Sequence, residues 1–291
     1  LYESADSTGQ VSLKDLFDKP DSLEGENNLN IDKLAFLICR GGWPHAVGMR
    51  EKIALAQAED YYEAVIKSDI NRADGVSKNP ERVKRLLRSL ARNQGAQIAN
   101  TMLKNDIVSN DTESLNEDTI ASYLNALKKI FVIEDMPAWN PNLRSKTSIR
   151  SSDTRYFVDP SIAVSALGAG PQDLINDLNT MGLLFETLCV RDLRVYAEKI
   201  GGSVLHYRDK SGLECDTVIH LKNGRYGLAE IKLGGQKLIE EGAANLKALS
   251  NKIDTSKMLA PSFLMIIIGV GEFAYKREDG IFIVPIGCLK D

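Results

Sequence analysis

The stretch from residue 179 to residue 285 alternates between helical and strand-like hydrophobic patterns, and this alternation limits the fold more than any other feature. Residues 179–199 have the apolar spacing of a long amphipathic helix. The strands are expected over residues 203–207, 216–221, 225–232, 263–269 and 281–285, with a helix over residues 240–251. The resulting order, α-β-β-β-α-β-β, predicts a domain that combines helices with a sheet.

Two neighbouring strands of this domain carry charged residues where apolar residues would pack better. Asp216 begins one strand, and Glu230 and Lys232 end the next. Strands usually avoid Asp, Glu and Lys. Because side chains alternate along a strand, Glu230 and Lys232 share a face, and a hairpin can add Asp216 to it. The pattern predicts two converging carboxylates beside a lysine. A hairpin whose charges face solvent or pair with one another is the alternative.

Two carboxylates, a backbone carbonyl and water form a ligand set that suits Mg²⁺ or Mn²⁺. Such an ion would polarise a phosphate and lower the pKa of a bound water, while the lysine would orient that water or offset developing charge. A zinc site is not expected, because the three histidines have no zinc-ligand spacing.

The first half of the chain is mainly helical in pattern. Residues 1–29 are polar and are interpreted as a linker, and residues 30–76 as a helical segment. Residues 77–160 contain three predicted helices followed by a strand, which indicates a winged helix-turn-helix domain. The helices are expected over residues 80–92, 96–103 and 116–129, and the strand over residues 132–136. Asn116 is the expected N-cap of the third helix.

Charge is distributed unevenly along the chain. The net charge of −4 argues against a uniformly basic nucleic-acid binder. However, residues 78–104 hold seven Lys or Arg against one Glu, and a second cluster contains Arg144, Lys146, Arg150 and Arg155. The candidate DNA-binding residues are Arg82, Lys84, Arg85, Arg88, Thr119, Ser122, Asn125, Lys128 and Lys129. A solvated basic face, or a winged helix that docks a protein, is the alternative.

Other features bound the class of protein. The four cysteines lie in apolar stretches and are expected to be buried, reduced thiols of a cytoplasmic protein. No stretch approaches the roughly 20 apolar residues of a membrane span, so no membrane partner is expected. Trp43 and Trp139, each beside a proline, are expected to pack turns against the core. The start without Met suggests a piece of a longer protein.

The helix–strand order and the charged hairpin resemble the PD-(D/E)XK, or restriction-endonuclease-like, superfamily, whose core is αβββαβ. The resemblance implies Asp216, Glu230 and Lys232 as catalytic residues. In that superfamily a glutamate of the first helix often completes the metal shell, and Glu186 in "LLFETLCV" fits this role. The implied metal ligands are therefore Asp216, Glu230 and Glu186. The expected fold class is a multidomain α+β or α/β protein, with the nuclease-like domain over residues 161–291.

Several longer segments, among them "CRGGWPHAV", "TIASYLNALKKIFVIEDMPAWNPNLRSK" and "RYFVDPSIAVSALG", are similar to the C-terminal half of bacterial AAA+-type ATPases that carry the domain of unknown function 4143. The resemblance covers essentially the full chain and implies that residues 30–76 form a lid-like segment of the ATPase. The P-loop pattern G-x-x-x-x-G-K-[ST] does not occur, so no ATP site is expected in this sequence. The missing ATPase module is an expected partner, and a homo-oligomer is left open.

Three functions remain at this point. The chain is a metal-dependent phosphodiesterase that acts on DNA, a catalytically inactive module that recruits DNA to the ATPase, or a protein-interaction and assembly module of that ATPase. The third function involves no nucleic acid. The sequence favours a combined interpretation, a DNA-associated regulatory module with a nuclease-like site.

Overall fold

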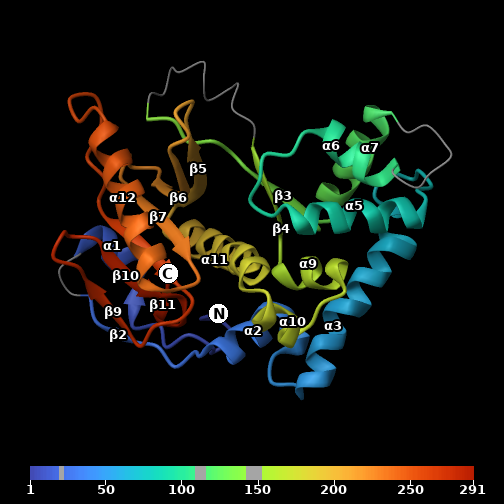
Figure 1. Ribbon diagram of the computed structural model, residues 1–291, viewed down its shortest axis with the longest axis horizontal. Coiled ribbons are helices and arrows are strands. Elements are labelled where there is room, and N and C mark those ends of the chain that lie inside the picture. Colours follow the sequence, from blue (N-terminus) through green and yellow to red (C-terminus); the bar gives the residue numbers. More distant parts are fainter. Residues whose placement is uncertain (20–22, 109–115, 142–152) are drawn as a thin grey trace. The chain divides into compact units, whose positions relative to one another are not determined.

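A computed structural model describes residues 1–19, 23–108, 116–141 and 153–291 (Figure 1). The chain forms two compact units, each built from separate stretches of sequence. Unit 1 comprises Leu1–Leu34, Met136–Asp153 and Cys189–Asp291, and unit 2 comprises Ala35–Asp135 and Thr154–Leu188. The boundaries fall inside three elements, α2 (Ile31–Arg40), β3 (Ile133–Met136) and α11 (Leu178–Lys199). The protein therefore combines helices with mixed sheet, as the expected α+β class requires.

Unit 1 is organised around a seven-stranded sheet with the order β2-β9-β10-β8-β7-β6-β5. The strands β5, β6 and β7 form antiparallel pairs, whereas β7, β8 and β10 run parallel. The strands are β2 (Gly25–Glu26), β5 (Gly202–Arg208), β6 (Glu214–Leu221), β7 (Tyr226–Lys232), β8 (Leu264–Ile268), β9 (Phe273–Lys276) and β10 (Phe282–Pro285). Each strand predicted for this sheet is present, and the short β2 and β9 were not anticipated.

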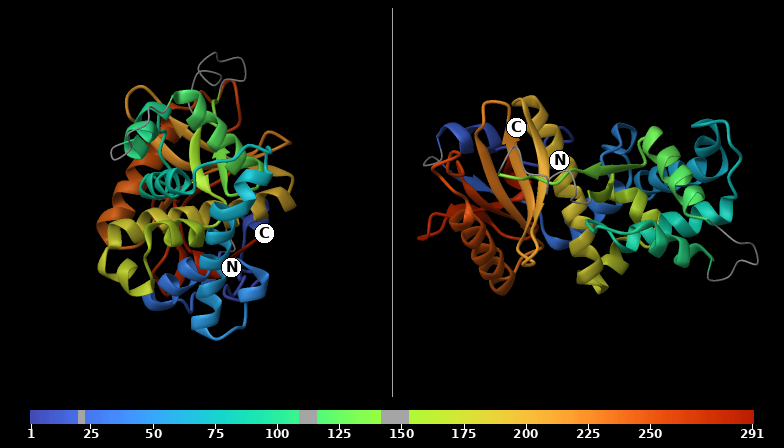
Figure 2. Two further views of the ribbon diagram at one scale, coloured as in Figure 1. Left: turned by 90° about the vertical axis from the view of Figure 1, so that its right-hand side faces the viewer. Right: turned by 90° about the horizontal axis from the view of Figure 1, so that it is seen from above.

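The helix α12 (Gln236–Lys252) packs along one face of this sheet, as Figure 1 and the right-hand view of Figure 2 show. Its apolar residues Ile239 and Leu246 share one buried cluster with Leu228 and Ile266 of the sheet. On the opposite face the ring of Phe263 lies against Gly227, where an added Cβ would come within 2.1 Å of the ring. The sheet is thus covered on both faces in this region, which explains its nearly continuous apolar strands.

The N-terminal residues, which we expected to form a linker, contribute structure to unit 1. The strand β1 (Val11–Ser12) pairs in parallel with β11 (Leu289–Lys290), and β2 pairs with β9. The helix α1 (Leu13–Asp18) follows β1 and is capped by the Ser12 side chain. The polar sequence of these residues did not predict strands. Their pairing partners lie more than 240 residues away in the chain, so no local pattern indicates the pairing.

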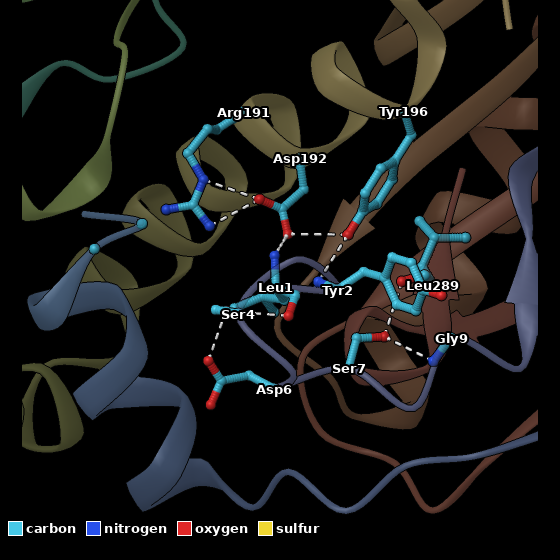
Figure 3. Close-up of polar contacts among 12 residues, drawn as sticks. Leu1, Tyr2, Ser4, Asp6, Ser7, Gly9, Arg191, Asp192, Tyr196 and Leu289 are labelled. Carbon is cyan, nitrogen blue, oxygen red and sulfur yellow. Dashed lines mark hydrogen bonds and ion pairs between the residues drawn. The ribbon is translucent and has the colours of Figure 1, made fainter. Parts of the chain in front are cut away.

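A buried carboxylate fastens the start of the chain to α11 (Figure 3). Asp192 Oδ2 accepts a hydrogen bond from the Leu1 nitrogen at 2.6 Å, and Asp192 Oδ1 accepts from Arg191 Nη2 at 2.7 Å. The Tyr2 amide donates to the Tyr196 hydroxyl at 3.2 Å. The Arg191 guanidinium compensates the charge of this acid, which would otherwise be costly to bury, and the Tyr2 hydrogen bond places the N-terminal segment beside α11.

The stretch after β3 belongs to unit 1 and lies along the edge strand β5. The Trp139 amide donates to the His206 carbonyl at 2.6 Å, and the His206 amide donates to the Pro137 carbonyl at 3.1 Å. The Trp139 ring is buried against Tyr207 and Tyr226. This confirms the expectation that Trp139 packs a turn against the core.

Unit 2 is helical apart from a small sheet of β3 and β4 (Thr154–Phe157). Besides parts of α2 and α11, its elements within the described residues are η1 (Pro44–Ala46), α3 (Glu51–Ala64), η2 (Val65–Asp69), α4 (Ile70–Arg72), α5 (Pro80–Arg92), α6 (Asn100–Val108), α7 (Glu117–Lys129), α9 (Pro160–Leu167) and α10 (Pro171–Asn176). The α5 helix begins and ends as predicted, while α6 starts four residues later than expected. The helical segment expected over residues 30–76 contains a π-helical turn, η2.

Two local predictions in unit 2 are confirmed. The Asn116 side chain accepts a hydrogen bond from the Thr119 amide at 2.8 Å and caps α7. The Trp43 ring packs against Tyr61 with 4.6 Å between ring centroids and an interplanar angle of 43°, and its indole N–H donates to the Ser161 hydroxyl. All four cysteines are buried and free. Among the helices of the described residues, none has the length and apolar character needed to cross a membrane.

The end of α7 contains a backbone conformation that L-residues rarely adopt. Phe131 has a φ of 54°, and its side chain is 77% exposed. The Phe131 amide donates to the Lys128 carbonyl at 3.1 Å, and the Val132 amide to the Leu127 carbonyl at 2.9 Å. These bonds form a Schellman motif, in which the left-handed position usually holds glycine. Phe131 therefore combines backbone strain with an exposed aromatic ring.

We expect Phe131→Gly to raise the free energy of unfolding by about 0.5–1 kcal/mol, because the relief of left-handed strain exceeds the added entropy of the unfolded chain. Urea unfolding followed by circular dichroism measures this change. Lys129→Gly, two residues earlier inside α7, is the matched control and should lower stability by about 1 kcal/mol. Equal destabilisation by both substitutions would contradict the assignment of strain to Phe131.

Candidate functional site

The charged residues of the β6–β7 hairpin meet at one end of these strands. The antiparallel register places Thr217 opposite Ala229, which brings Asp216 next to Glu230 on the adjoining strand. Lys232 lies two residues beyond Glu230 on the same face. The prediction of a hairpin that gathers Asp216, Glu230 and Lys232 therefore agrees with the geometry.

The Lys232 ammonium connects the two carboxylates. It lies 3.0 Å from Asp216 Oδ2 and 2.7 Å from Glu230 Oε2. Asp216 Oδ2 also accepts a hydrogen bond from the Ile231 amide at 2.8 Å. Sequence reasoning did not identify this amide as a contributor, because any residue between Glu230 and Lys232 offers the same N–H. The three side chains and one amide make up what we call the hairpin charge cluster.

Glu230 is the most deeply buried member of the hairpin charge cluster, with only 1% of the residue exposed. Its Oε1 atom is buried and has no hydrogen-bond partner among the described residues. Burial, together with the negative charge of Asp216, raises the pKa of Glu230 to about 8. A cation that reaches the Oε1 atom would stabilise the ionised form of Glu230.

Lys232 is held in its charged form. Burial lowers the pKa of Lys232, but the negative charges of Asp216 and Glu230 raise it by more, so the pKa lies above the ordinary lysine value. The Lys232 side chain is 21% exposed and remains accessible from solvent. Lys232 can therefore supply positive charge and hydrogen-bond donors, but it is a poor proton acceptor near neutral pH.

The helix α12 packs closely over the hairpin charge cluster. A Cβ built on Gly242 would lie 3.4 Å from the Glu230 Cβ and 3.6 Å from the Lys232 Cε. Glycine inside a helix destabilises it by roughly 1 kcal/mol relative to alanine. Gly242 in the middle of α12 therefore signals that the helix approaches the sheet closely. Apolar periodicity alone does not reveal this signal, and we did not anticipate it.

Burial and the charges of Glu230 and Asp216 also raise the pKa of the neighbouring Cys215, which stays a thiol.

Glu186, the third implied metal ligand, belongs to unit 2. Its Oε1 accepts a hydrogen bond from the Tyr156 hydroxyl at 2.6 Å. Gly95, with a φ of 67°, leaves room for this carboxylate, since a Cβ there would come within 2.5 Å of it. Within the ranges that the structure describes, no group of three or more His, Cys, Asp or Glu side chains is arranged to hold a metal ion. The cluster itself offers two carboxylates, Asp216 and Glu230.

The candidate DNA-binding residues of α5 differ in their availability. Arg88 is exposed, whereas Arg82, Lys84 and Arg85 are partly buried. Arg85 donates to a backbone carbonyl of α6 at 3.0 Å, and Lys84 lies 3.5 Å from an acid in the preceding turn. Lys78, counted in the same basic stretch, is buried, and its ammonium donates to Asp74 at 2.6 Å. Arg88 is thus the most accessible cation of this group.

On α7 the exposed candidates are Asn125 and Lys129. Thr119 and Ser122 are partly buried, and the Thr119 hydroxyl donates to the capping Asn116 at 2.6 Å. Lys128 is ion-paired with an aspartate of β3. The same aspartate, Asp135, binds Arg155 at 3.0 Å. Arg144, Lys146 and Arg150 of the second basic cluster lie outside the described residues.

Two family models match the chain. Residues 31–173 match a domain of unknown function (DUF8612), and residues 181–289 match a domain of unknown function (DUF4143). The resemblance to the DUF4143 domain is therefore confirmed for the C-terminal part, which includes the hairpin charge cluster, whereas the middle of the chain matches a different family. No curated protein and no solved structure is similar enough to match.

The buried acid predicts a specific pH dependence of stability. The pKa of Glu230 is raised in the folded protein, from an ordinary value of 4.5 to about 8. Its contribution to stability is therefore full below about pH 4.5 and is lost as the pH rises through about 8. Glu230→Gln cannot titrate, so we expect its stability relative to the parent to rise by on the order of 2 kcal/mol between pH 5 and pH 9.

Urea unfolding in EDTA at both pH values measures this difference. Glu241→Gln, at an exposed acid of α12, is the matched control and should show no such change. A Glu230→Gln variant whose stability keeps a constant offset from the parent at both pH values would show that Glu230 ionises normally.

Proposed function

We propose that unit 1 carries a nuclease-like domain of the PD-(D/E)XK type and that its hairpin charge cluster hydrolyses phosphodiesters of DNA with Mg²⁺ or Mn²⁺. The element order α11-β5-β6-β7-α12-β8 supports the fold assignment. The observation that carries the proposal is the convergence of Asp216, Glu230 and Lys232, with the buried Glu230 Oε1 lacking a partner among the described residues.

The donor set fits a hard divalent cation. Asp216 and Glu230 supply the carboxylate oxygens that Mg²⁺ and Mn²⁺ prefer, and the free Glu230 oxygen would gain a partner. A bound ion would polarise a phosphate oxygen and lower the pKa of a coordinated water. Glu186 is engaged by Tyr156, so Asp216 and Glu230 are the proposed ligands.

The chain's own groups would prepare the substrate for reaction. The charged Lys232 would attract a phosphate and stabilise negative charge that develops on it. The Ile231 amide holds the Asp216 carboxylate in a fixed orientation, so little reorganisation is needed. α12, through Gly242, packs against the side chains of Glu230 and Lys232.

One observation favours a second candidate, a DNA-binding module without catalysis. Lys232 already contacts both carboxylates and compensates their charge, as a lysine does in an internally closed cluster. In this alternative the cluster stabilises the hairpin, and the chain recruits DNA or assembles the parent ATPase. The same residues serve both candidates, so only an activity measurement separates them.

The comparison that tests cleavage uses supercoiled and single-stranded DNA with Mg²⁺ or Mn²⁺. We expect cutting by the native chain, and a loss of at least about 100-fold in Asp216→Ala and Lys232→Ala, because the first removes a proposed metal ligand and the second removes the cation at the reacting phosphate. Asp254→Ala and Lys237→Ala change exposed residues of unit 1 and should leave cutting intact. Calorimetric titration with Mn²⁺ follows metal binding separately. A native chain that binds neither metal nor cuts DNA would leave the non-catalytic alternative.

We further propose that unit 2 contacts DNA through a winged helix formed by α5, α6, α7 and the β3–β4 sheet. The order of three helices followed by a small sheet supports this assignment. Arg88, Asn125 and Lys129 are its exposed candidate contacts. The resemblance to AAA+-type ATPases supports a role in which this module delivers DNA to a neighbouring ATPase, with assembly of that ATPase as the competing role.

Salt-dependent binding tests the DNA contact. With fluorescein-labelled duplex DNA, Lys129→Gln should weaken binding and lower the slope of log affinity against log salt by about 1, because one phosphate contact is lost. Asn125→Ala should weaken binding without changing the slope. Lys67→Gln, an exposed lysine elsewhere in unit 2, serves as the control. Equal effects of Lys67→Gln and Lys129→Gln would show that DNA binding depends on overall positive charge and not on a contact at Lys129.

A further inference from the structure

A second polar site lies at the other end of the β6–β7 hairpin, near its turn. A pocket of about 250 Å³ is lined there by side chains of α1, the end of α11 and the hairpin. Three of the lining residues are cations, Lys14, Lys199 and Arg225, and one is an acid, Asp18. The pocket is therefore cationic, in a protein whose net charge is negative.

Arg225 is fixed in place within this pocket. Its Nη1 donates to Asp18 Oδ1 at 2.8 Å and to the Phe17 carbonyl at 3.1 Å. Its guanidinium also lies over the Phe17 ring, 5.7 Å from the centroid. The side-chain hydrogen bonds of Arg225 all use Nη1, so Nε and Nη2 have no partner among the described residues. An arginine held on one side and free along the Nε–Nη2 edge is pre-organised for a bidentate oxyanion.

The other two cations differ in their engagement. Lys199 pairs with Asp291 at 2.8 Å, but two thirds of its side chain remains exposed. Lys14 is exposed, and no acid pairs with it in the part of the chain that the structure describes. Lys14 and Arg225 thus line the same pocket, and a ligand with several negative oxygens can contact both.

We propose that this pocket binds a phosphate group, with Arg225 and Lys14 as the principal contacts and Lys199 as a supporting charge. A phosphate offers more than one anionic oxygen and matches the planar fork of arginine. The volume lies just below the roughly 300–1,000 Å³ of drug-sized sites, which favours a small phosphate-bearing ligand. Phe17, which is buried, forms an apolar floor that fixes the arginine.

The phosphate pocket is separate from the hairpin charge cluster. Leu221 and Arg225 lie five residues along their strands from Asp216 and Glu230, a distance of roughly 17 Å in extended backbone. Phosphate binding there therefore requires neither a divalent metal nor catalysis. The phosphate can come from a free phosphate compound or from the backbone of a nucleic acid, and both share the chemistry that the pocket recognises.

Calorimetric titration of the full chain at low salt, in EDTA, with inorganic pyrophosphate tests the proposal. A parallel arm uses a single-stranded oligonucleotide without terminal phosphates. We expect binding in at least one arm, weakened about tenfold by Arg225→Lys, which keeps the charge but removes the fork. Lys14→Gln should weaken the same binding about fivefold by removing one charge-assisted contact. Because no described residue pairs with Lys14, this variant keeps the fold and remains informative if Arg225→Lys is unstable.

The control is Lys237→Gln, at an exposed lysine of α12 whose side chain is 90% accessible. It should leave binding unchanged. Binding of pyrophosphate alone would identify a free phosphate compound as the source, and binding of the oligonucleotide would identify nucleic acid. No binding in either arm would overturn the proposal, as would binding that Lys14→Gln and Lys237→Gln alter equally.

Discussion

The antiparallel register between β6 and β7 is the constraint on which the candidate site depends. Thr217 lies opposite Ala229, and this single pairing brings Asp216 beside Glu230 and turns Lys232 toward both. A slip of one residue would move every side chain of one strand to the opposite face of the sheet. The apolar neighbours prevent such a slip, because Val218 and Leu228 must reach the core beneath α12. Burial of apolar residues thus fixes the positions of the charged ones.

The same burial gives the hairpin charge cluster its chemistry. Glu230 is almost fully removed from water, and that raises its pKa, while the two carboxylates keep Lys232 charged. A buried ion pair is weak evidence for stability, because desolvation offsets most of the attraction. Stability alone is therefore a weak explanation for three charged groups at the end of two strands. The phosphate pocket near the hairpin turn differs from this cluster in burial, because its cations remain partly exposed. Its arginine is held by contacts on one side only.

Local sequence patterns were sufficient for most individual elements. The helices α5, α7, α11 and α12 and the strands β5 to β8 were found from apolar periodicity, capping residues and Pro at the start of helices. The convergence of Asp216, Glu230 and Lys232 followed from the alternation of side chains along two adjacent strands. The N-terminal residues show the limit of such patterns, because β1 and β2 exist only through pairing with β11 and β9. The Tyr196 hydroxyl likewise acquires its partner, the Tyr2 amide, from a residue 194 positions away in the chain.

The sequence by itself determined the mixed α and β class, the charged hairpin and the residue types suited to a divalent cation. These properties depend on short-range periodicity and on the chemistry of single side chains. Only the tertiary structure decided that Glu230 keeps a buried oxygen without a partner among the described residues, that Glu186 is engaged by Tyr156, and that Arg225 presents a free edge to a cationic pocket. Burial, hydrogen-bond partners and pockets arise from contacts between residues far apart in the chain, and no local pattern records such contacts.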